Sequence, residues 1–93
     1  MLEATITITD PVGLHARPAA VLVRTAGQYQ ARVQLVHGTK RADARSIIQL
    51  LALGVRPGSP VTVTAEGMDE AEALAAVLDV QAATTEPEEK RGG

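Results

Sequence analysis

The hydrophobic pattern of this chain changes its period within the first 30 residues. Residues 2–9 alternate strictly between apolar and polar side chains, which is typical of a β-strand buried on one face. Residues 10–13 (Asp-Pro-Val-Gly) break the alternation, since proline cannot donate to a β-ladder and glycine allows a sharp turn. From Ala16 the apolar residues instead recur at helical spacing until Gly27. The strand and the helix would each have one apolar face. Packing helices on one side of a sheet buries both of these faces.

The alternating pattern returns twice later in the chain. Residues 31–36 predict a second strand, and residues 61–65 predict another. Between them, His37-Gly38-Thr39 predicts a hairpin turn into a short polar strand near residues 40–42. The sheet would therefore contain four strands.

Two further helices are predicted from the signals at their ends. Ser46 is the expected N-cap of a short helix over residues 47–53, which Gly54 ends. Asp69 and Glu72 have the spacing of a capping box at the start of the last helix. The order β-α-β-β-α-β-α, with one apolar face on each element, predicts an α+β fold: a four-stranded antiparallel sheet with three helices on one face.

Length and composition restrict the class of protein. The 93 residues fit one domain, expected over residues 1–82, and residues 83–93 are expected to form a flexible charged tail. Without cysteine the chain has no disulfide, no thiol nucleophile and no thiolate metal site. A formal net charge of −2 and a single aromatic residue argue against binding to nucleic acid. The start does not resemble a signal peptide and no apolar run reaches roughly 20 residues, so we expect a cytoplasmic protein without membrane insertion.

Metal, cofactor and hydrolase sites are not indicated. The two histidines, His15 and His37, are far apart in the chain and have no clustered carboxylates, which argues against a metal site. The sequence has no Walker-type phosphate loop, and neither Ser46 nor Ser59 stands in a nucleophile elbow. We therefore expect no metal and no cofactor, and residues 13–20 remain as the candidate site.

Residues 13–20 (Gly-Leu-His-Ala-Arg-Pro-Ala-Ala) combine a histidine with a helix start. His15 is the expected N-cap, and Pro18 is tolerated in the first turn. The amides of Ala16 and Arg17 would lack intrahelical partners and favour an anion, to which the Arg17 guanidinium adds a charge. A histidine at a helix start is more often a plain capping or surface residue, and a single arginine is more often a solvated charge. Their adjacency favours a site that takes and holds a phosphoryl group.

Residues 13–19 resemble the active-site signature of the HPr family, the histidine-containing phosphocarriers of the phosphoenolpyruvate-dependent sugar phosphotransferase system. Residues 45–48 (Arg-Ser-Ile-Ile) are similar to a second family signature, and the resemblance extends over residues 2–80. It implies the family's open-faced β-sandwich. It also implies that His15 accepts a phosphoryl group on Nδ1 from phosphorylated enzyme I and passes it to cytosolic A domains of sugar permeases, with Arg17 stabilising the phosphate. Such a protein is a stoichiometric carrier and not an enzyme.

The second predicted helix is apolar almost all round, although a helix on a sheet can bury only one face. We expect Leu50 and Leu53 to enter the core. The remaining apolar side chains would form an exposed docking patch near the histidine: Ile47, Ile48 and Leu51. In the family the matching positions dock enzyme I and permease domains. The alternative is a helix that is buried on more than one face.

Three residues have both a structural and a functional interpretation. Ser46 is an N-cap, and in many Gram-positive relatives the matching serine is phosphorylated by a dedicated kinase, which makes the protein a co-regulator of carbon catabolite repression. A Ser46 kinase, its phosphatase and a catabolite-control regulator are therefore implied partners. Arg24, on the same helix face as Arg17, either contacts acidic partners or is a solvated charge. His37 is expected to be a hairpin residue and nothing more.

Some features depart from the family, and other functions stay open. Val12 stands where relatives often have a polar residue, and the chain end gives no basis for placing a carboxylate at the site. A paralogue in a nitrogen-regulatory or dihydroxyacetone-kinase phosphotransfer chain would have the same residues. A non-covalent α+β regulatory domain has no need of a histidine followed by Ala-Arg-Pro, and a regulator acting only through Ser46 has no need of His15. We expect a monomer.

Overall fold

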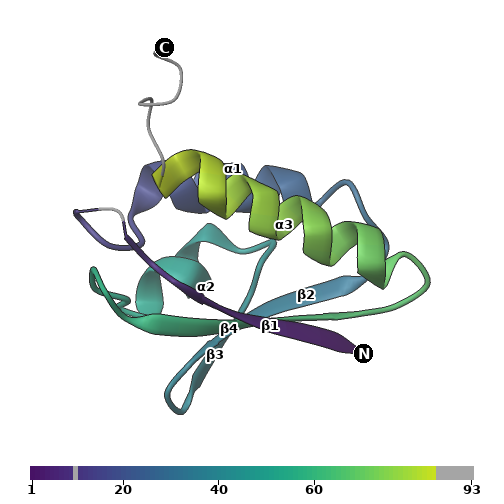
Figure 1. The fold of residues 1–93 in the computed structure, drawn as a ribbon, viewed down its shortest axis with the longest axis horizontal. Helices are drawn as coiled ribbons and strands as arrows, with labels where there is room; N and C mark the ends of the chain where they lie inside the picture. The colour runs from purple at the N-terminus through teal and green to yellow at the C-terminus, as the bar shows by residue number, and fades with distance from the viewer. Residues whose placement is uncertain (10, 86–93) are drawn as a thin grey trace.

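Seven elements follow one another in the computed structural model, which describes residues 1–9 and 11–85 (Figure 1). The strands are β1 (Leu2–Thr7), β2 (Arg32–His37), β3 (Lys40–Asp43) and β4 (Pro60–Glu66). The helices are α1 (Ala16–Ala26), α2 (Ile47–Ala52) and α3 (Glu70–Thr85). The predicted order β-α-β-β-α-β-α is confirmed, with element boundaries that differ by a few residues.

The strands form one antiparallel sheet in the order β1-β4-β2-β3. β2 and β3 are the predicted hairpin, in which His37 pairs with Lys40. Gly38, in the turn between them, has a φ of +65°, which glycine adopts without strain. β4 lies between β1 and β2, so that the first strand of the chain meets the last, with Leu2 opposite Ala65.

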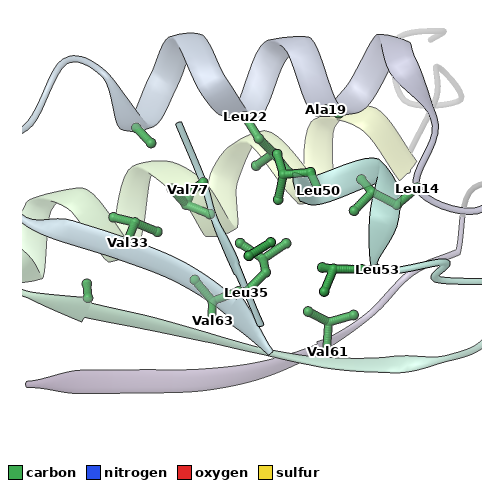
Figure 2. Packing of buried hydrophobic residues seen from close by; sticks show 14 of the residues in the cluster. Leu14, Ala19, Leu22, Val33, Leu35, Leu50, Leu53, Val61, Val63 and Val77 are labelled. Atoms are coloured by element: carbon green, nitrogen blue, oxygen red, sulfur yellow. The ribbon is translucent and has the colours of Figure 1, made fainter. Parts of the chain in front are cut away.

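The helices cover one face of the sheet, as predicted, and the core fills the space between the two layers (Figures 1 and 2). The inward-facing side chains of β2 and β4 are at most 2% exposed, which confirms the predicted alternation: Val33, Leu35, Val61, Val63 and Ala65. The helices contribute the buried side chains of Leu22, Leu50 and Val77. The other sheet face carries polar groups such as the hydroxyls of Thr5 and Thr62, which are 3.4 Å apart.

The predicted capping box of Asp69 and Glu72 is wrong. Asp69 directly precedes α3, but its carboxylate accepts hydrogen bonds from the amides of Gln30 (2.9 Å) and Ala31 (2.8 Å), just before β2. These donors are 39 and 38 residues away in the chain, so local spacing gave no sign of them. The carboxylate fastens the start of α3 to the start of β2.

Gly67, in the turn between β4 and α3, lies against the same segment. Its amide donates to Glu70 Oε1 at 3.0 Å. A Cβ added to Gly67, whose φ is +147°, would lie 2.8 Å from the Cα of Ala31, so only glycine fits there. The amide donors lower the pKa of both carboxyls, that of Asp69 chiefly through Gln30 and that of Glu70 chiefly through Gly67.

The C-terminal end of the domain differs from the prediction in one respect. α3 continues to Thr85, beyond the predicted domain boundary at residue 82. Residues 86–93, the remainder of the predicted tail, lie outside the described residues. No helix in the described part of the chain is long and apolar enough to cross a membrane.

Candidate functional site

His15 is the N-cap of α1, as predicted. Its backbone is extended (φ −118°, ψ −172°), and its carbonyl accepts the first intrahelical hydrogen bond from the amide of Ala19 at 3.0 Å. The residue is half-buried, and its imidazole makes no capping hydrogen bond to the helix. A serine or aspartate at this position would place its own oxygen over the helix end.

The first turn of α1 favours an anion. Ala16 and Arg17 precede the first intrahelical hydrogen bond, so their N–H groups point out of the helix end. Pro18, which is buried, has no N–H to leave unsatisfied. The turn contains no acidic residue, and the side chain of Arg17 is exposed. The amides, the helix dipole and the guanidinium together favour a negatively charged group beside His15.

The loop between β1 and α1 is fastened to the loop between α2 and β4. The amide of Leu14 donates to Val55 O at 3.2 Å. Ile8 makes two further bonds to the second loop, donating to Ser59 O at 3.1 Å and accepting from the amide of Gly58 at 2.7 Å. Three backbone hydrogen bonds therefore hold the segment that leads to the histidine.

Leu14 is also anchored through its side chain. It is 7% exposed and lies at the same end of the core as Leu50 and Leu53 (Figure 2). Leu53 is the C-cap of α2. The residue before His15 is thus tied, by backbone and by side chain, to the part of the core that α2 completes.

Ser46 caps α2, as predicted. Its Oγ accepts a hydrogen bond from the amide of Gln49 at 3.2 Å, and its own amide donates to Asp43 O at 3.0 Å. Gln49 Oε1 accepts from the amide of Asp43 at 2.9 Å, and Asp43 Oδ1 accepts from the amide of Arg45 at 2.9 Å. Side-chain hydrogen bonds therefore close the turn between β3 and α2.

The exposure predicted for three apolar residues of α2 is confirmed. Leu50 and Leu53 are buried, at 0% and 3% exposed. The exposed fractions are 38% for Ile47, 81% for Ile48 and 39% for Leu51. We call these last three residues the α2 patch. Its docking role stays a prediction, because exposure alone does not identify a partner.

Val12 is a further exposed apolar side chain, which the sequence indicated only as a departure from the family pattern. It is 68% exposed, in the turn between β1 and α1. The signal for its exposure is its place between a proline and a glycine, outside any apolar period. It adds apolar surface close in sequence to His15.

Arg24 and His37 occupy other parts of the fold. Arg24 is exposed in the last turn of α1, roughly 13 Å along the helix axis from His15. A cation at this end of the helix interacts favourably with the helix dipole. His37 is the last residue of β2, and its Nδ1 lies 3.2 Å from Pro60 O, which agrees with a structural role in the hairpin.

The candidate site is an exposed helix end rather than an enclosed pocket. Three surface depressions, of about 510, 410 and 330 Å³, are lined by other residues, and neither His15 nor Arg17 borders them. Among the described residues, no group of three or more His, Cys, Asp or Glu side chains could hold a metal ion.

Charge is distributed unevenly along the chain. Residues 11–65 contain seven of the 9 Lys and Arg residues but only one of the 11 Asp and Glu residues, Asp43. Arg17, Arg24 and Arg56 are all exposed, on α1 and on the loop after α2. An acidic partner surface would therefore meet favourable charge around α1 and α2.

Comparison with known proteins agrees with this geometry. A family model described as "PTS HPr component phosphorylation site" matches residues 2–83. HPr from Thermoanaerobacter tengcongensis is 40% identical, with a TM-score of 0.87 over 95% of this chain and 99% of that chain. The histidine-containing phosphocarrier protein of Mycoplasma is 31% identical, with a TM-score of 0.88 over 90% and 96%. Crh, a Bacillus subtilis catabolite repression protein described as a domain-swapped dimer, is 36% identical, with a TM-score of 0.71 over 87% and 93%.

Proposed function

The chain belongs to the HPr family of the phosphotransferase system, and from this premise we propose that it carries a phosphoryl group on His15. The observation that supports the proposal best is the start of α1, where His15 is the N-cap and is followed directly by the N–H groups of Ala16 and Arg17 and by the exposed side chain of Arg17. The protein acts as a stoichiometric carrier, phosphorylated by one partner and dephosphorylated by the next, and not as an enzyme.

The chemistry is a transfer between two side chains. Nδ1 of His15, with the imidazole proton on Nε2, attacks the phosphorus atom of phosphorylated enzyme I. The new P–N bond forms as the bond between phosphorus and enzyme I breaks, and enzyme I keeps that electron pair. Delivery to the cytosolic A domain of a sugar permease breaks the bond at His15 in turn. Positioning and charge stabilisation dominate such transfers, so an exposed site completed by each partner is sufficient.

The partners dock on the α2 patch. Ile48, at 81% exposed, is its most accessible side chain. Arg17, Arg24 and Arg56, which are exposed on α1 and on the loop after α2, supply positive charge for an acidic partner. Enzyme I and the permease A domains share this surface, since both have to reach His15.

Ser46 is the proposed regulatory site. A phosphate on its Oγ would turn the oxygen that now accepts from the amide of Gln49 into an ester oxygen and would add about −2 charge next to Ile47. That charge would oppose docking of an acidic partner. A dedicated kinase, its phosphatase and a catabolite-control regulator are the corresponding partners, and the family resemblance supports this role.

The carrier is proposed to act in the cytoplasm as a monomer, since each partner needs access to the same helix end. Crh is described as a domain-swapped dimer, so the oligomeric state needs a direct measurement. Sedimentation analysis of the purified chain at micromolar concentration is expected to give a single species of the 9.7 kDa chain.

Intact-mass spectrometry tests the carrier role. The protein is incubated with phosphoenolpyruvate and enzyme I, and an acid-labile gain of one phosphate is expected. His15→Ala should abolish the gain, whereas His37→Ala, the matched control at the other histidine, should retain it. If a verified enzyme I adds no phosphate, a role in sugar phosphotransfer would be contradicted. The enzyme I homologue of a nitrogen-regulatory or dihydroxyacetone-kinase phosphotransfer chain would then be tested as the donor.

Steady-state phosphotransfer kinetics test the docking surface. Ile48→Asp should raise the KM for enzyme I about tenfold, because it places a charge in an apolar contact facing an acidic partner. Met68→Asp is the control, since Met68 is 97% exposed and stands in the turn before α3. Equal effects of the two substitutions would show that net charge, and not the α2 patch, controls docking.

A further inference from the structure

Gly13 makes a backbone contact that leaves no room for a side chain. A Cβ added to Gly13 would lie 2.4 Å from Val55 O and 3.2 Å from the Cα of Arg56. The φ of Gly13 is +87°, in the left-handed region that favours glycine. The loop that leads to His15 therefore lies directly against the loop after α2.

The same peptide group of Val55 is used twice. Its oxygen accepts the amide of Leu14 at 3.2 Å, one residue before His15, and faces Gly13, two residues before it. The Val55 side chain is 5% exposed, so this acceptor belongs to a buried, well-packed residue. A fixed acceptor of this kind sets where the backbone enters α1.

We propose that the Val55 peptide is the positioning group for His15, acting through Leu14 N–H and the close approach of Gly13. This inference rests on the proposed phosphocarrier function and names what orients its nucleophile. Val55 is the third residue after the end of α2. The same part of the chain therefore carries the surface on which partners dock and supports the segment that orients the imidazole. The rate of phosphoryl transfer depends on the position of the imidazole, since a misplacement of about 1 Å can lower the rate on the order of a hundredfold.

The test compares two glycine substitutions. Gly13→Ala introduces both a strained φ and a clash with Val55 O. Gly38→Ala, in the hairpin turn between β2 and β3, introduces a comparable strain at φ +65° but has no atom within 4 Å of the added Cβ. The difference between the two variants reports the contact with Val55, separately from the general cost of alanine at positive φ.

The measurements are chosen so that a merely structural loss would not reproduce them. For phosphorylated protein, the ³¹P chemical shift and the half-life of the phosphohistidine without partners should change in Gly13→Ala and stay at wild-type values in Gly38→Ala. In transfer from enzyme I, Gly13→Ala should lower kcat about tenfold while KM changes less than about twofold. Identical shift, half-life and kcat in the two folded variants would overturn the proposal.

A milder variant decides the matter if Gly13→Ala does not fold. Pro57→Ala frees the backbone of the loop after α2, because proline fixes its own φ and restricts the residue before it. It keeps glycine at position 13 and removes the ring whose Cδ lies 3.4 Å from the Cβ position of Gly13. It should change the phosphohistidine half-life relative to wild type. An unchanged half-life and ³¹P shift in Pro57→Ala would then count against positioning by Val55.

The failure of this inference can be told from the failure of the proposed function. If wild-type protein is not phosphorylated at all, the carrier role fails. The ring ¹⁵N chemical shifts of unphosphorylated His15 still test the positioning, and they should differ from wild type in Gly13→Ala but not in Gly38→Ala. Unchanged ring shifts in both variants would refute positioning even for a functional carrier.

Discussion

The N-termini of α1 and α3 lie at opposite ends of the helical layer, because the two helices run antiparallel (Figure 1). At α3, Asp69 accepts two amides from the segment before β2, and Glu70 accepts the amide of Gly67. At α1, the N-cap is His15, and the first turn holds no carboxylate. The two helix starts therefore differ in charge: at α3 two carboxylates fasten neighbouring segments, whereas the first turn of α1 holds an arginine and no carboxylate.

α2 provides an intermediate case. Its N-terminus is occupied by the hydroxyl of Ser46, which accepts from Gln49. A hydroxyl stabilises the helix start as a carboxylate does, but it can also be phosphorylated. The three helix starts thus differ mainly in the chemistry of the residue at the N-cap or next to it.

The largest effect is expected at the start of α1. Arg17→Ala should lower the rate of phosphorylation by enzyme I about a hundredfold, because the amides alone then stabilise the transferring group. The free energy of unfolding of Arg17→Ala should differ from that of wild type by less than about 0.5 kcal/mol, since the Arg17 side chain is exposed. Quench-flow kinetics and urea denaturation measure the two quantities.

Two controls accompany Arg17→Ala. Arg17→Lys keeps the charge but loses the planar fork, and it should be intermediate in rate. Arg32→Ala removes the same charge at the start of β2 and should leave the rate unchanged. A rate for Arg17→Ala within about twofold of wild type would mean that the guanidinium is a solvated charge.

The opposite outcome is expected at the start of α3. Asp69→Ala leaves the amides of Gln30 and Ala31 without their acceptor, and it should lower Tm by about 5 °C or more. The transfer rate at a temperature where the variant is folded should stay within about twofold of wild type. Calorimetry measures Tm and the transfer assay measures the rate. A large loss of rate in the folded variant would contradict the view that the start of α3 serves stability and the start of α1 serves transfer.

A series at Ser46 separates capping from charge. Ser46→Ala should cost about 1 kcal/mol of unfolding free energy, whereas Ser46→Asn and Ser46→Asp keep a capping oxygen and should cost little. Only Ser46→Asp should raise the KM for enzyme I, by a few-fold, because only it adds negative charge beside the α2 patch. Equal KM values for the Asn and Asp variants would argue against regulation by charge.

The smallest effect concerns acid stability. The folded-state pKa values of Asp69 and Glu70 lie below their ordinary values, so the unfolded chain binds more protons as the pH falls below about 5. Their contribution to stability is present above that range and is lost as the pH falls through their folded-state pKa values. Asp69→Asn should flatten this acid limb in urea titrations, and an unchanged limb would mean that the carboxylate is not held by its amide donors.

Most of the fold follows from local patterns, which explains what was and was not predictable. The alternation of β2, the cap at Ser46 and the exposure of Ile48 each depend on residues within a few positions of one another. The carboxylate of Asp69 and the peptide of Val55 instead act on segments about 40 residues away. Such contacts leave no periodic or spacing signal, because they depend on how the finished layers pack.

The fastening of the first loop to the loop after α2 has a consequence for how the molecule is made. Leu14 leaves the ribosome before Val55 and Ser59 exist, and at roughly 5–20 residues per second the wait for them lasts several seconds. β1 likewise has no strand beside it until β4 is synthesised. The segment that holds His15 is therefore among the first parts of the chain to be translated, yet it is fixed in place only after the chain has been made as far as β4.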